Sequence, residues 1–139
     1  MHEGTKMAKV LVIEDEPELG SLIKQTLEDA GLDVRHAANG IEGIKEFRQE
    51  PCEVVITDIL MPEKDGLETI MELRALNPKV KIIAISGGGR LSQGALLLSH
   101  AQAFGADYAV QKPLVLRDML NLVLKLIPPD GLPEADTRA

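Results

Sequence analysis

Apolar residues along this chain form short continuous runs that alternate with longer stretches in which apolar positions recur every three or four residues. A short continuous run is typical of a strand buried on both faces, and the longer spacing is typical of an amphipathic helix. The runs expected to be strands are Lys9 to Ile13, Leu32 to Ala37, Val54 to Asp58, Val80 to Ser86 and Asp107 to Gln111. The clearest of them, Val54 to Asp58, ends on a carboxylate.

Each predicted strand is followed by a predicted helix. The helices are expected to begin near Pro17, Asn39, Asp65, Ala95 and Leu114. Their ends are expected near Gly31, Pro51, Asn77, Gly105 and Ile127, where glycine or proline interrupts the pattern. The apolar positions expected to face inward are Leu19, Leu22, Ile23, Leu27, Ala30, Ile41, Ile44, Phe47, Leu67, Ile70, Met71, Leu76, Leu97, Leu98, Ala101 and Phe104. This alternation predicts an α/β fold with a single parallel sheet that helices cover on both faces.

Composition narrows the class of protein. The chain has 139 residues, enough for one domain, and its residues are 45% hydrophobic but only 2% aromatic, so Leu, Ile, Val and Ala must fill the core. The net charge of -7 argues against direct binding of nucleic acid. A single cysteine, Cys52, excludes an internal disulfide and is expected to be a small buried hydrophobe.

Location and domain limits follow from the same features. No apolar run approaches the ~20 residues of a membrane span, and we expect a cytoplasmic protein with no membrane contact. Residues 1–7 are expected to be disordered or left over from cloning. Residues 8–128 are expected to form the domain, and residues 129–139 a flexible C-terminal tail or the start of a linker.

Chemically active side chains follow the strands. Glu14 and Asp15 come after the first strand, Asp58 ends the third, Ser86 ends the fourth and Lys112 follows the fifth. The carboxyl ends of parallel strands share one edge, where ligands bind in open α/β sheets. Three crowded carboxylates need a cation, and oxygen ligands of this kind suit Mg²⁺. With a nearby ammonium and hydroxyl, this set favours phosphoryl transfer to Asp58.

These motifs together resemble the receiver domains of two-component response regulators, over about Lys9 to Ile127. The motifs that carry the resemblance are Glu14-Asp15 as the acidic pair, Asp58 as the phosphoacceptor, Met61-Pro62 with Asp65-Gly66 as the loop after it, Ser86 as the switch hydroxyl, and Lys112-Pro113. The resemblance implies a doubly wound, five-stranded parallel sheet of flavodoxin-like order 2-1-3-4-5 with five helices, in three α/β/α layers.

The resemblance also implies roles for single residues. Asp15 and Asp58 would bind Mg²⁺ directly, Glu14 through water and Leu60 through its backbone carbonyl. Asp58 would accept a phosphoryl group from a histidine kinase or histidine phosphotransfer protein. Lys112 would pair with that group and Ser86 would move toward it, and the bond from Lys112 to Pro113 is a candidate for the cis form.

The expected output of such a module is a change in the surface formed by the fourth helix, fifth strand and fifth helix. That surface would bind an unknown downstream protein or a missing effector domain, or form a homodimer through helices 4 and 5. The last helix favours a docking role, because its polar residues occupy one side and apolar residues cover the rest, a wider apolar arc than burial alone needs. The protein is not expected to be a conventional enzyme, because it would catalyse only its own phosphorylation and dephosphorylation.

Some positions depart from the family pattern. Ala109 stands where many receivers carry an aromatic switch residue, and Tyr108 beside it should point to the opposite face of the strand. The segment after Ser86, with Gly87-Gly88-Gly89, is longer than usual and lacks the pattern of a nucleotide-binding P-loop. Leu60 and Gly88 stand where other receivers carry polar groups that position water, which gives the hypothesis of slow self-dephosphorylation.

Two alternatives remain open at this point. A Mg²⁺-dependent phosphohydrolase with an aspartyl nucleophile needs a general acid, commonly two residues after the nucleophile, and Leu60 occupies that position. A pseudo-receiver would bind partners without phosphorylation, and Ala109 is the feature that favours it.

The histidines, which are His2, His36 and His100, are expected to be surface or packing residues.

Overall fold

The computed structural model describes residues 7–59, 66–86 and 101–128. Its strands are β1 (Lys9–Ile13), β2 (Asp33–Ala37), β3 (Val54–Asp58), β4 (Lys81–Ser86) and β5 (Tyr108–Gln111). Its complete helices are α1 (Pro17–Asp29), α2 (Gly40–Gln49), α3 (Gly66–Leu76) and α5 (Leu116–Leu126). Residues 101–103 are also helical and belong to the stretch predicted as the fourth helix.

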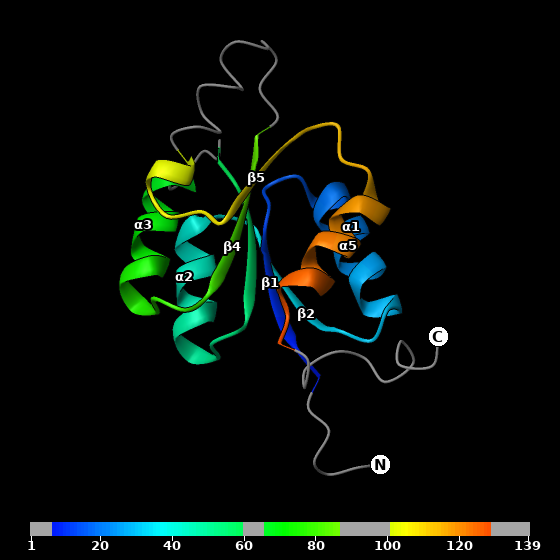
Figure 1. Ribbon diagram of the computed structural model, residues 1–139, viewed down its shortest axis with the longest axis horizontal. Coiled ribbons are helices and arrows are strands. Elements are labelled where there is room, and N and C mark those ends of the chain that lie inside the picture. The colour runs from blue at the N-terminus through cyan, green and yellow to red at the C-terminus, as the bar shows by residue number, and fades with distance from the viewer. Residues whose placement is uncertain (1–6, 60–65, 87–100, 129–139) are drawn as a thin grey trace.

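All neighbouring strands are parallel, and the sheet has the order β2-β1-β3-β4-β5. Figure 1 shows α1 and α5 on one face of this sheet and α2 and α3 on the other. The predicted fold class, strand order and three layers are therefore confirmed. In this order β1 and β3 are adjacent, so the residues that follow these two strands meet at one edge of the sheet.

The core has two parts, one on each face of the sheet. Leu11 and Ile13 point toward α2 and α3, where they pack with Phe47, Ile70 and Leu73. Val10 and Val12 alternate with them and pack on the other face, against α1 and α5. Burying one Leu or Ile side chain completely stabilises the fold by about 1.5–3 kcal/mol. The packing on both faces therefore fixes the sheet, and with it the positions of the strand ends.

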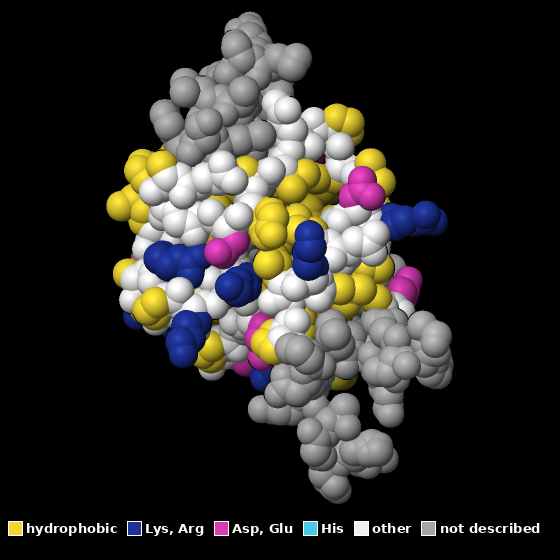
Figure 2. Space-filling model, viewed as in Figure 1, with side chains coloured by type: hydrophobic (Ala, Val, Ile, Leu, Met, Phe, Trp, Pro, Cys, Tyr) yellow, Lys and Arg dark blue, Asp and Glu magenta, His cyan; other side chains and the backbone are white. Residues whose placement is uncertain are grey.

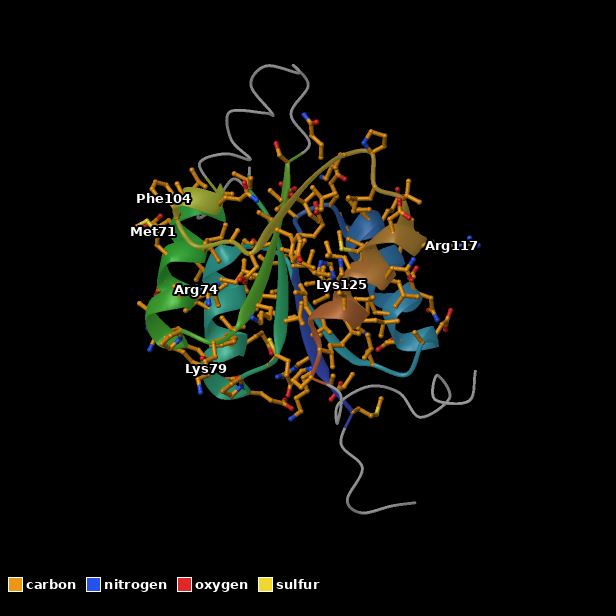
Figure 3. All side chains as sticks on the ribbon, viewed as in Figure 1. Met71, Arg74, Lys79, Phe104, Arg117 and Lys125 are labelled. Carbon is orange, nitrogen blue, oxygen red and sulfur yellow. The ribbon has the colours of Figure 1, made fainter. Side chains whose placement is uncertain are left out.

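Some helix positions predicted to face inward are exposed instead. These are Leu22, Ile41, Met71, Leu76 and Phe104. At ~100° per residue, Leu22 and Met71 fall on the far side of their helices from the buried positions, which include Ile23 in α1 and Leu73 in α3. Phe104 follows the helical residues 101–103 and so does not continue their inward face. Figure 3 shows Met71 and Phe104 at the outer side of the molecule.

Cys52, predicted to be a small buried hydrophobe, is only partly buried, and it packs against the core on the α2 and α3 face. Its thiol donates to the carbonyl oxygen of Val54 at 3.3 Å, and burial raises the pKa of this thiol to about 12. The partial exposure arises because Cys52 precedes β3, outside the sheet. A thiol with so high a pKa carries little thiolate near neutral pH, which fits a packing role for Cys52.

Several predictions fall on residues outside those that the structure describes. They concern the carbonyl of Leu60, the Met61-Pro62 and Asp65 positions of the loop after β3, the Gly87-Gly88-Gly89 segment, the inward positions Leu97 and Leu98, and the ends of the chain at 1–6 and 129–139. None of the described helices is both long and apolar enough to cross a membrane.

Candidate functional site

The ends of β1 and β3 bring three carboxylates together. Ile13 of β1 is the register partner of Thr57 of β3, so the residues that follow these two emerge side by side. Carboxylate oxygens of Glu14, Asp15 and Asp58 lie within 4.8 Å of one another. The structure therefore gathers the three acidic residues that the sequence placed at these strand ends.

Burial makes this cluster electrostatically costly. The side chain of Glu14 is only 1% exposed, and Asp58 is also buried, whereas Asp15 is more accessible. Burial, and then the negative charge of Asp58, raise the pKa of Glu14 from 4.5 to about 7. Near neutral pH and without a bound metal ion, the Glu14 carboxyl group is therefore protonated in part of the molecules.

Lys112 is the cation that faces this cluster. Its Nζ lies 3.2 Å from Oδ2 of Asp58, 3.6 Å from Oε2 of Glu14 and 3.8 Å from Oε1 of Glu16. Burial by itself would lower the pKa of Lys112, but the charges of Asp58 and Glu14 outweigh it and raise that pKa. The ammonium therefore stays protonated beside the carboxylates. The peptide bond from Lys112 to Pro113 is cis, as expected.

Ser86 ends β4 at the same edge of the sheet. Its register partner is Gln111 of β5, and its carbonyl oxygen accepts a hydrogen bond from the Lys112 backbone N–H at 2.8 Å. This bond fixes the main chain of Lys112 relative to β4. The Oγ of Ser86 is fully buried and has no hydrogen-bond partner within the described part of the chain. A buried hydroxyl without a partner is available to donate to an incoming oxygen.

Gly66, the first residue of α3, packs against the main chain of Asp58. A Cβ built on Gly66 would lie 2.2 Å from the carbonyl oxygen of Asp58 and 2.4 Å from Cα of Ile59. The N–H of Gly66 donates to the carbonyl oxygen of Ile59 at 2.7 Å. The absence of a side chain at this position therefore lets α3 begin directly against the residues that carry the acidic group of β3.

The donor set fits a hard divalent cation. All three clustered side chains offer oxygen, and Oε1 of Glu14 is buried without a hydrogen-bond partner among the described residues. An unpartnered buried oxygen beside two other carboxylates is poorly stabilised by protein groups alone. Carboxylates of this kind, completed by water, are the usual protein ligands of Mg²⁺.

The edge strand β5 carries no buried aromatic residue. Tyr108 is exposed, and Ala109 beside it is half-buried with Ala84 of β4 as its register partner. The tyrosine therefore lies on the surface of the β5 edge, and the position next to β4 holds only a methyl group.

Two contacts near the cluster were missed by sequence reasoning. Glu16 approaches Lys112, and the imidazole of His36 contacts the main chain of Glu14. The contact of Glu16 could have been predicted, because Glu16 continues the acidic run after β1. The contact of His36 could not have been predicted, because it depends on how β2 and α1 pack around the loop between β1 and α1.

Sequence comparisons with known proteins all point to the same family. Residues 10–124 match the model of the response regulator receiver domain. The chain is 31% identical to the response regulator receiver protein CpdR of Brucella abortus, over 87% of this chain and 98% of that protein. It is 34% identical to the chemotaxis protein CheY of Listeria monocytogenes, over 86% of this chain and 98% of that protein.

Solved structures with a similar fold come from the same family. A CheY-like receiver domain protein from Methanospirillum hungatei superimposes with a TM-score of 0.78 at 27% identity, covering 86% of this chain and 93% of that one. The sheet order, the acidic cluster at its edge and these matches agree over most of the chain. The chain therefore belongs to the response regulator receiver domain family.

Proposed function

We propose that Asp58 accepts a phosphoryl group from the phosphohistidine of a histidine kinase or a histidine phosphotransfer protein, in the presence of Mg²⁺. Receiver domains of this family are signalling modules that interact with histidine kinases, bind Mg²⁺ through acidic residues, and are not conventional enzymes. The observation that carries the proposal is the position of Asp58, within 4.8 Å of two other carboxylates and 3.2 Å from the Lys112 ammonium.

The chemistry follows from these positions. An oxygen of Asp58 forms a bond to phosphorus while the phosphorus–nitrogen bond of the donor breaks, and the electron pair of that bond stays on the donor's imidazole. Lys112, already beside Oδ2 of Asp58, pairs with oxygens of the transferred group, and the buried Ser86 hydroxyl donates to one of them. The domain thus catalyses only its own phosphorylation and dephosphorylation.

Magnesium would be held by Asp15 and Asp58 directly and by Glu14 through water, and the carbonyl of Leu60 would complete the protein ligands. When bound, the ion offsets negative charge on the carboxylates and on the phosphoryl oxygens. The unpartnered Oε1 of Glu14 supports a role in binding this hydrated ion.

A groove beside the cluster gives the phosphodonor a place to approach. It has a volume of about 750 Å³ and is lined by the start of α1 and by the segment from Lys112 to Leu114. Leu22 of α1 is exposed in it, and Glu16 and Glu18 give it an acidic rim. These features fit the apolar and basic face of a helix that carries the phosphohistidine.

The output surface is proposed to include β5 and α5. Figure 2 faces the β5 edge and shows apolar side chains gathered there and toward α5. Tyr108 of β5 and Val115, just before α5, are exposed, and Leu116 and Leu120 of α5 are partly buried. A downstream protein, an effector domain or a second copy of the chain would bind this surface. Light scattering before and after phosphorylation tests the homodimer.

The decisive experiment uses the purified chain, Mg²⁺ and acetyl phosphate. We expect mass spectrometry to show the addition of one phosphoryl group that is stable in acid and labile in base. The addition should vanish in Asp58→Asn and persist in Asp29→Asn, a matched change of an exposed acid on α1. A wild-type protein that folds and binds Mg²⁺ but takes no phosphoryl group would instead be a pseudo-receiver. Turnover of phosphoesters would indicate the phosphohydrolase.

A further inference from the structure

The side chain of His36 binds the main chain of the acidic loop. Its Nε2 lies 2.9 Å from the carbonyl oxygen of Glu14, and since a carbonyl oxygen can only accept, Nε2 carries the hydrogen. The neighbouring Ala37 accepts the N–H of Glu14 through its carbonyl oxygen at 3.0 Å. The end of β2 therefore holds both main-chain polar groups of Glu14.

This hydrogen bond determines the direction of Asp15. The carbonyl of Glu14 belongs to the peptide group that joins Glu14 to Asp15, and a peptide group is planar. Fixing its oxygen therefore fixes the N–H and Cα of Asp15. The carboxylate of Asp15 has no hydrogen-bond or ion-pair partner in the described ranges, so its position depends on its own main chain.

Gly20 of α1 provides the room that the imidazole occupies. A Cβ built on Gly20 would lie 2.3 Å from both Cε1 and Nε2 of His36. Gly20 is buried in the interior of α1, where glycine costs roughly 0.5–1 kcal/mol relative to alanine. A glycine in this unfavourable position, placed against the ring atom that makes the hydrogen bond, indicates that the ring position matters.

We propose that His36 is a positioning residue for the magnesium site, acting through the Glu14–Asp15 peptide group, with Gly20 as the residue that gives it space. The inference rests on the proposed function, because it concerns the ion that Asp15 and Asp58 would bind. Groups that orient metal ligands by hydrogen bonds typically change metal affinity 10–100-fold when removed. A residue that only packs, as the sequence indicated for His36, would affect stability but not affinity for the ion.

The test compares four proteins with the wild type: His36→Ala, His36→Gln, Gly20→Ala and the double variant of His36→Ala with Gly20→Ala. Calorimetry measures the affinity of each for Mg²⁺ alone, and NMR of the metal-free proteins follows the backbone amide of Asp15. Thermal unfolding without Mg²⁺ identifies variants that fail to fold.

We expect His36→Ala and Gly20→Ala each to weaken Mg²⁺ binding about tenfold and to move the Asp15 amide signal. His36→Gln keeps an N–H donor and should recover most of the affinity. In the double variant the added methyl group has no ring to displace, so the loss should equal that of His36→Ala alone. Two independent packing defects would instead give losses of Mg²⁺ affinity that add in the double variant.

Mg²⁺ affinities equal to the wild type in folded His36→Ala and Gly20→Ala, with an unmoved Asp15 amide, would overturn the inference. A wild-type protein that does not bind Mg²⁺ would overturn the proposed metal role instead. In that case the Asp15 amide in the metal-free variants still decides whether His36 positions the loop.

Discussion

The ammonium of Lys112 lies 3.2 Å from Oδ2 of Asp58, although these two residues are 54 positions apart in the chain. Oε2 of Glu14 lies 3.6 Å from the same ammonium, so both buried carboxylates face one cation. With Asp15 close by, the cluster carries more negative charge than Lys112 offsets. In the metal-free protein the excess of negative charge at this edge of the sheet therefore lowers the stability of the fold.

Asp15→Asn should accordingly have opposite effects on stability and on metal binding. Removing one charge from a cluster within 4.8 Å relieves repulsion, and we expect the metal-free protein to gain of the order of 1 kcal/mol, or about 2–6 °C in Tm. Calorimetry should show Mg²⁺ affinity reduced by roughly tenfold or more. Asp29→Asn makes the same charge change at the exposed end of α1 and should leave the affinity for Mg²⁺ unchanged. A metal-free Asp15→Asn protein that is less stable than wild type would contradict the repulsion argument.

Glu14 should make the stability of the metal-free protein depend on pH. Its pKa is raised in the folded state from 4.5 to about 7, so the folded protein holds a proton that the unfolded chain has released. This contribution to stability is complete below the unfolded pKa and is lost as the pH rises through the folded pKa. Relative to Glu14→Gln, the wild type should therefore lose stability from about pH 5 to about pH 8. Urea unfolding across this range measures the difference, and Glu18→Gln, an exposed acid in α1, should show none.

The same raised pKa predicts how Mg²⁺ binding responds to pH. The ion favours ionised carboxylates, so its binding should release a proton from Glu14 and strengthen as the pH rises through about 7. Calorimetry in buffers of different ionisation enthalpy measures the proton released. Glu14→Gln should bind Mg²⁺ with an affinity that changes little over this range, and an unchanged pH dependence in this variant would assign the titration to another group.

Arg74 should contribute to stability without affecting the proposed phosphorylation site. Its guanidinium donates to the carbonyl oxygens of Pro78, Val80 and Gly105 and to Oδ2 of Asp107, at 2.6–3.1 Å. These bonds join the end of α3 to the residues just before β4 and β5, whereas Asp58 ends β3 at the other end of the same parallel sheet. Figure 3 shows Arg74 on α3. Arg74→Met should cost roughly 2 kcal/mol in urea unfolding.

Arg74→Lys separates the charge of this residue from its geometry. An ammonium cannot supply the forked donors of a guanidinium, so the lysine variant should recover only part of the lost stability. Both variants should accept phosphoryl from acetyl phosphate at the wild-type rate when assayed well below their Tm. Full stability in Arg74→Lys would show that charge alone is sufficient.

The fold followed from the sequence because strands buried on both faces carry continuous apolar runs. Val54–Asp58 has the predicted limits, and the strand predicted from Val80 begins one residue later, at Lys81. The acidic residues could be placed because Glu14 and Asp15 come directly after β1 and Asp58 ends β3, and the carboxyl ends of parallel strands share an edge. The contact of His36 with Glu14 could not be predicted in this way, because it depends on the register of β2 and the docking of α1.

Gly66 connects this folding argument to function, because the start of α3 packs directly on the main chain of Asp58. Gly66→Ala would place a Cβ 2.2 Å from the Asp58 carbonyl oxygen, and a backbone atom cannot yield as a flexible side chain does. We expect a loss of about 1–3 kcal/mol in stability and a clear loss in the rate of phosphorylation by acetyl phosphate, although no carboxylate has changed. Ile70→Val, in the buried face of the same helix, should cost about 0.5–1.5 kcal/mol and leave that rate unchanged. If Gly66→Ala reacted as fast as Ile70→Val, the main-chain position of Asp58 would not limit the reaction.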